Sequence, residues 1–142
     1  MATITITQSN VDTILNSCVS GNYYIVEETI RLSSNNPYKF QPGCFIEFRG
    51  GSFTAPNGVT AKVKLNESQV IAPVYCLFGK NVAVDGFTNA LVHAEWFNDR
   101  EAGMKDDEVI NKAMLSARGC PVTLECRDYY LYAPLEVLYV TD

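Results

Sequence analysis

Short segments of alternating apolar and polar residues fill the middle of the sequence and constrain its fold more than any other feature. A period of two is typical of a β-strand with one buried face. Turn-forming residues such as Asn66 and Asp85 follow these segments. The predicted strands, with their apolar residues inward, are Cys44–Phe48, Val59–Leu65, Val82–Val84 and Val122–Cys126, and further extended runs are Tyr23–Leu32 and Tyr129–Val137.

The predicted strands recur at a spacing of about twenty residues. Ile46 lies 20 residues after Val26 and 17 residues before Val63, and Val82 follows 19 residues later. A repeat of about this length, made of strands without helices, is typical of one coil of a β-solenoid, in which successive strands stack in parallel. An antiparallel sandwich also has half-buried strands and frequent turns, so the period alone leaves both folds open.

Two amphipathic helices favour the solenoid. The first follows Ser9 and Asn10, and the second begins at Asp106 and Asp107. A helix laid over the end of a β-helix covers its open strand edges, whereas a sandwich needs no helix there. We therefore predict a mainly β fold, a parallel β-helix with two short amphipathic helices that cap or flank it. The apolar stripes are Val11, Ile14, Leu15 and Cys18, and Val109, Ile110, Ala113, Met114 and Ala117.

Charge and composition argue against several classes of partner. The chain has 16 acidic and 11 basic residues, so we expect it to repel nucleic acid. Its longest near-apolar run, residues 70–79, is too short to span a bilayer, and no signal peptide is evident at the N-terminus. Five scattered cysteines and a single histidine, His93, form no zinc or disulfide pattern. We expect reduced thiols and no metal or cofactor.

The acidic residues give no clear catalytic pattern. Asp106 and Asp107 suit the start of a helix, where carboxylates cap amides and favour the helix dipole. Glu27 and Glu28 point to opposite faces of a strand. Asp85 and Asp99 have no calcium-loop spacing.

Two further motifs have a structural and a functional interpretation. His93 and Glu95 could exchange a proton, but the sequence names neither an orienting partner nor a pocket. Gly50 and Gly51 lack the lysine of a phosphate-binding loop and are predicted to form a tight corner of a coil. We therefore expect no catalytic, cofactor or metal site, and no enzyme activity, in residues 1–142.

One set of motifs resembles the N-terminal signature of the pectate-lyase-like β-helix superfamily. Its parts are Ala94–Phe97, Asp106–Ala113, Val122–Leu124 and Tyr129–Leu131. An upstream pattern looks like tail proteins of phages from Bacteroides-like hosts: Phe48–Phe53, Val70–Ala72, Phe78, Gly86, Phe87 and Asn89. The resemblance implies a right-handed β-helix in which Trp96 and Phe97 form a hydrophobic plug rather than a platform for sugar stacking.

The sequence departs from the family in two loops. Residues 98–105 contain only Gly103 where relatives have a glycine-rich run, and Cys126, Arg127 and Asp128 replace a Pro-Ala-Gly turn. We expect one domain, with an N-terminal strand and helix in residues 1–21, the first coils in 22–97, and a helix plus a further coil in 98–142. The family's solenoids are longer, so we expect the coils to continue past Asp142.

The implied function is structural: an attachment or receptor-binding module of a phage tail spike or tail fibre, located in the virion. The expected partners are other tail proteins, further copies in a homotrimer, and a host surface glycan. Apolar Leu135, Val137 and Leu138 would be covered in such an assembly. The alternatives are the N-terminal part of a polysaccharide lyase or glycoside hydrolase of this fold, and a host-encoded adhesin.

Overall fold

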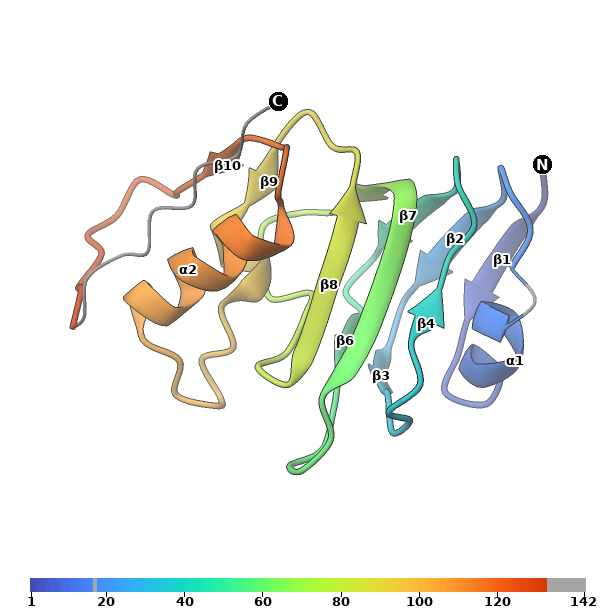
Figure 1. Ribbon diagram of the computed structural model, residues 1–142, viewed down its shortest axis with the longest axis horizontal. Coiled ribbons are helices and arrows are strands. Elements are labelled where there is room, and N and C mark those ends of the chain that lie inside the picture. Colours follow the sequence, from blue (N-terminus) through green and yellow to red (C-terminus); the bar gives the residue numbers. More distant parts are fainter. Residues whose placement is uncertain (17, 133–142) are drawn as a thin grey trace.

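The computed structural model describes residues 1–16 and 18–132, which form a right-handed, β-helix-like solenoid of about four turns (Figure 1). The strands are β1 (Thr3–Ile6), β2 (Tyr23–Val26), β3 (Thr29–Arg31), β4 (Tyr38–Lys39), β5 (Phe45–Phe48), β6 (Ser52–Thr54), β7 (Ala61–Ile71), β8 (Val82–Phe87), β9 (Val92–His93) and β10 (Val122–Thr123). The helices are α1 (Val11–Asn16), the 3₁₀ helix η1 (Ala94–Phe97) and α2 (Asp106–Ser116).

The registers confirm the parallel stacking. Ile4 of β1 pairs with Tyr24 of β2, Tyr24 pairs with Ile46 of β5, and Ile46 pairs with Val70 of β7. Tyr24, Ile46 and Val70 are buried, so one residue from each coil adds to the same inward column. Every strand pair described is parallel, which an antiparallel sandwich would not give.

The register corrects the spacing that the sequence suggested. Val63 pairs with Val84 of β8 and not with a residue near Ile46, because β7 runs around a corner of the solenoid. Its first half pairs with β4 and β8, and its second half pairs with β5. Asn66 and Glu67 form the corner with φ of 48° and 63°. Paired residues of β1 to β8 lie 19 to 25 positions apart, and those of β9 and β10 lie 30 apart, so the spacing of 17 compared different sheets.

Aromatic rings fill the centre of the coils. Phe78 contacts Phe48, Phe53 and Phe97, with ring centroids 5.7, 6.5 and 5.5 Å apart. Phe97 is fully buried, and Trp96 is buried with its indole N–H donating to Pro73 O at 2.9 Å. Stacked and edge-to-face rings add to the burial of apolar area that stabilises each coil.

The two helices cover different regions of the solenoid (Figure 1). At the N-terminal end, α1 buries Val11 and Leu15 near β1 and β4. Farther along, α2 packs beside β8 and η1. Buried residues of α2 include Val109, Ile110 and Ala113. The amphipathic stripes therefore face the core, as the period of 3.6 predicts.

Three local predictions were wrong. Asp106 and Asp107 do not cap α2: Lys105 is the N-cap residue, and the aspartates are the first two residues of the helix. The strand Val122–Cys126 is shorter than predicted, because β10 ends at Thr123 and both Leu124 and Cys126 are exposed. Of the extended run Tyr129–Val137, residues 129–132 form no strand. The rest of that run, together with Leu138, lies outside the described residues.

In residues 1–16 and 18–132, the helices are too short and too polar to cross a membrane.

Candidate functional site

A groove of about 660 Å³ lies along one side of the solenoid. Its lining comes from β3, β6, the segment before Gly79, η1, the loop after η1 and the segment after β10. Parallel strands place the hydroxyl side chains of Thr29 and Ser52 from successive coils next to each other, which makes this part of the lining polar. The lining residues used below are Cys76, Glu95, Asp99, Glu125 and Arg127.

Arg127 connects three parts of the chain at this groove. Its Nε and Nη2 donate to Glu95 Oε1 at 2.9 and 2.6 Å, and its Nη2 and Nη1 donate to Asp106 Oδ1 and Oδ2 at 3.0 and 3.3 Å. The guanidinium also lies 3.7 Å from the centre of the Tyr129 ring. A planar guanidinium can bind two carboxylates at once, which a lysine ammonium cannot do with the same geometry. Arg127 therefore joins η1 and α2 to the segment after β10.

Glu95 has both carboxylate oxygens occupied. Oε1 accepts from Arg127 and from Tyr129 Oη at 3.0 Å, while Oε2 accepts from Asn98 Nδ2 at 2.8 Å. Burial by itself would raise the pKa of Glu95, but the hydrogen bonds from Asn98, Arg127 and Tyr129 outweigh it and lower this pKa. A carboxylate held ionised in this way is a poor general acid at neutral pH.

The two aspartates of α2 also bind the segment after β10. Asp106 Oδ2 accepts from Tyr130 N at 2.7 Å, and Asp107 Oδ1 accepts from Tyr132 N at 3.4 Å. The hydrogen bond from Arg127 lowers the pKa of Asp106, against the effect of burial. These carboxylates near the helix start connect segments of the chain, and they also lie at the favourable end of the helix dipole.

His93 does not pair with Glu95, which corrects the partner considered from the sequence. Its Nδ1 lies 3.4 Å from Glu125 Oε1, and the centroid of its ring lies 5.1 Å from that of the Trp96 ring. Nδ1 is buried and has no hydrogen bond of good geometry within the part of the chain that the structure describes. Glu125 lines the groove, whereas Glu95 is paired with Arg127.

Lys112 of α2 contacts the segment directly before β8. Its Nζ donates to Gly79 O at 2.7 Å and to Lys80 O at 3.3 Å. Burial lowers the pKa of Lys112 to about 8, and burial raises the pKa of the nearby Cys76 thiol to about 11. Asp99 completes this region by accepting from Lys80 N at 2.9 Å.

Gly50 and Gly51 occupy a corner for two different reasons. Gly50 has φ of 81°, the left-handed region that glycine adopts at low cost. At Gly51, a Cβ atom would lie 2.6 Å from Val26 O and 2.7 Å from Glu28 O, so only glycine fits against the neighbouring coil.

Among residues 1–16 and 18–132, no group of three or more His, Cys, Asp or Glu side chains could hold a metal ion.

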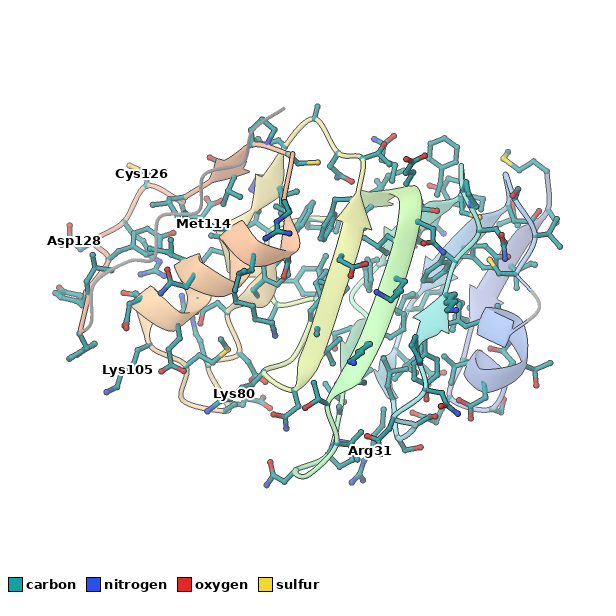
Figure 2. The ribbon with its side chains drawn as sticks, in the orientation of Figure 1. Arg31, Lys80, Lys105, Met114, Cys126 and Asp128 are labelled. Carbon is teal, nitrogen blue, oxygen red and sulfur yellow. The ribbon has the colours of Figure 1, made fainter. Side chains whose placement is uncertain are left out.

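Sequence reasoning missed Arg127, the residue that organises this site. The signal was present as a departure: Cys126, Arg127 and Asp128 stand where the resembled family has a Pro-Ala-Gly turn. Figure 2 shows Cys126 and Asp128 on either side of this position, on the segment that runs past α2. Neither charge pattern nor spacing indicated that Glu95 and Asp106 would share one guanidinium, because their side chains meet only when η1 and α2 pack together.

Comparison with known proteins adds no family to this fold. No family model matches the chain. No curated protein and no solved structure matches it either. The resemblance to pectate-lyase-like proteins is therefore supported at the level of the β-solenoid fold, and its implied membership of a phage-tail family has no support from these comparisons.

Proposed function

We propose that this chain is a structural β-solenoid module of a phage tail spike or tail fibre. The observation that carries the proposal is the column Ile4, Tyr24, Ile46 and Val70, in which four successive coils stack in register. A solenoid of this kind lengthens by adding coils and gives a stiff body for attachment or receptor binding. The assignment to a phage tail rests, in addition to this geometry, on the sequence resemblance to phage tail proteins.

The arrangement of the carboxylates favours a structural role over catalysis. Glu95 and Asp106 are bound by Arg127, and Asp107 accepts from a backbone amide. Glycoside hydrolysis needs one carboxylic acid that can donate a proton and a second carboxylate placed across the bond. A pKa of Glu95 below its usual value opposes the first of these roles.

An activity assay separates the proposal from its alternative, the N-terminal part of a polysaccharide lyase or glycoside hydrolase. We expect the purified chain to release no reducing ends and no unsaturated uronates from capsular polysaccharide. Release that is lost in Glu95→Gln and kept in Glu27→Gln would establish the enzyme instead. Glu27 is the control because it is an exposed carboxylate away from the groove.

The location in the virion is tested directly on particles. Antiserum against the chain should label the tails of phage particles that carry its gene, in electron micrographs of negatively stained virions. Labelling of the bacterial surface without particles would favour a host-encoded adhesin.

The proposed homotrimer is tested on the purified chain. Light scattering across a wide concentration range should show a trimer, and a monomer at every concentration would contradict the proposal.

A further inference from the structure

Two cysteines far apart in the sequence lie close together at the N-terminal end of the solenoid. Cys18 and Cys44 are 26 residues apart, and their sulfur atoms lie 4.0 Å from each other. Cys18 belongs to the segment between α1 and β2, and Cys44 directly precedes β5. All five cysteines of the chain are free thiols in this structure.

Each of the two thiols donates a hydrogen bond to a neighbouring group. Cys18 Sγ donates to Tyr24 Oη at 3.0 Å, and Cys44 Sγ donates to Val19 O at 3.3 Å. Cys44 is buried, with 1% of its surface exposed, while Cys18 is partly exposed. A reagent from solution therefore reaches Cys18 first, and Cys44 lies behind it.

We propose that Cys18 and Cys44 are an oxidation site, at which a low-molecular-weight disulfide such as oxidised glutathione converts the two thiols to an intramolecular disulfide. The S–S bond is about 2.05 Å long, so the sulfurs must approach by about 2 Å. Cys18 lies outside the strands and helices, and its movement breaks no hydrogen bond of a strand ladder. The proposal does not depend on the function proposed above.

The reaction proceeds by two exchange steps. The Cys18 thiolate attacks one sulfur of oxidised glutathione, forms a mixed disulfide and releases one glutathione thiolate, which takes up a proton. The Cys44 thiolate then attacks the Cys18 sulfur and releases the second glutathione. Two protein thiols are oxidised, and one glutathione disulfide is reduced to two thiols. Burial raises the pKa of Cys44, so the second step is the slower one and accelerates with pH.

The crosslink would tie the segment after α1 to the start of β5. The closed loop contains β2, β3 and β4, so the segment after α1 could no longer separate from the start of β5 without breaking a covalent bond. A disulfide that closes a loop of this length restricts the unfolded chain and stabilises the folded one. Because the coils contact mainly their neighbours, the gain falls at the N-terminal end of the solenoid.

The test uses the whole chain with Cys126→Ser, since the exposed Cys126 thiol would otherwise link separate molecules. After incubation with oxidised glutathione, the intact mass should fall by two hydrogens. After alkylation of the remaining thiols, peptide mass spectrometry should find Cys18 joined to Cys44. The melting temperature should rise by roughly 5 to 10 °C and return to its starting value with dithiothreitol. Cys18→Ser and Cys44→Ala should each abolish the rise, and Cys120→Ala should keep it.

Three results would overturn the proposal. They are unmodified Cys18 and Cys44 thiols in the Cys126→Ser chain after prolonged oxidation at pH 8.5, glutathione remaining on Cys18 without reaction of Cys44, or a disulfide between another pair. The mass measurement on the Cys126→Ser chain decides the outcome even if a Cys18 or Cys44 variant fails to fold.

Discussion

Asn89 pairs with Val70 through two hydrogen bonds between neighbouring coils. Asn89 Oδ1 accepts from Val70 N at 2.9 Å, and its Nδ2 donates to Val70 O at 2.7 Å. Asn89 lies just after β8, and its side-chain amide continues the ladder of β7 where the backbone of β8 has ended. Both partners are buried, so neither backbone group of Val70 could turn to water instead.

Replacing Asn89 with alanine should destabilise the protein by about 2 to 3 kcal/mol, because two buried backbone groups lose their partners. Urea unfolding followed by circular dichroism measures the change in the free energy of unfolding. Asn57→Ala is the matched control, since Asn57 is exposed in a turn and its removal should cost less than about 0.5 kcal/mol. Equal effects of the two substitutions would contradict the role of Asn89.

Arg127→Ala should destabilise the protein by about 2 kcal/mol at pH 7, because Glu95 would stay buried without its guanidinium. The matched control is Arg100→Ala. Arg100 is 75% exposed and 3.9 Å from Glu95, and its loss should cost less than about 0.5 kcal/mol.

The effect of Arg127→Ala should depend on pH. Glu95 and Asp106 have pKa values below their usual 4.5 and 3.8 in the folded state. Their contribution to stability is therefore present above those usual values and is lost as pH falls through the folded pKa values. The difference in unfolding free energy between wild type and Arg127→Ala should shrink as pH is lowered from 6 toward about 3. A constant difference would show that the ion pairs contribute little.

Gly50 and Gly51 should respond differently to alanine. Gly50→Ala places a Cβ in open space at positive φ and should cost about 1 kcal/mol. Gly51→Ala forces the coil backbone away from Val26 O and should cost about 3 kcal/mol. Thermal unfolding of both variants shows which substitution lowers the stability more. A smaller loss at Gly51 than at Gly50 would contradict the close contact between coils.

Lys112 should make the free energy of unfolding rise as the pH is raised above 8. Its pKa falls from 10.5 to about 8 on folding, so between these values the unfolded state binds more protons and stability rises with pH. Compared with Lys112→Met, the wild type should gain about 2 kcal/mol between pH 8 and 10. Cys76 titrates in the opposite sense and its pKa depends on Lys112, so both proteins should also carry Cys76→Ala. Urea unfolding of this pair at the two pH values then isolates Lys112. Parallel pH profiles would contradict the burial of its ammonium.

The alternation of residues was enough to predict which side chains enter the core. Ala61, Val63 and Leu65 are buried and Lys62 is exposed, because a strand that is covered on one face has only one arrangement that keeps its lysines in water. The same reasoning placed the apolar stripes of α1 and α2. It failed at Val122–Cys126, where the alternation continues but β10 ends after two residues.

The candidate site could not be predicted in the same way. Glu95, Asp106 and Arg127 lie far apart in the sequence, and their side chains meet because η1, α2 and the segment after β10 converge. Each is an ordinary charged residue by itself. Asn89 is similar, since its partner Val70 is 19 residues away.

The β-strand period, the two amphipathic helices and the glycine corner follow from local sequence, because they depend on the local backbone and on the division between apolar and polar faces. The register follows from tertiary contacts. Corner residues Asn66 and Glu67 let β7 continue from one sheet into the next, so that Ile46 pairs with Val70 rather than with a residue near Val63. Register depends on which coils touch, and contacts between residues more than twenty positions apart are not encoded in any local pattern.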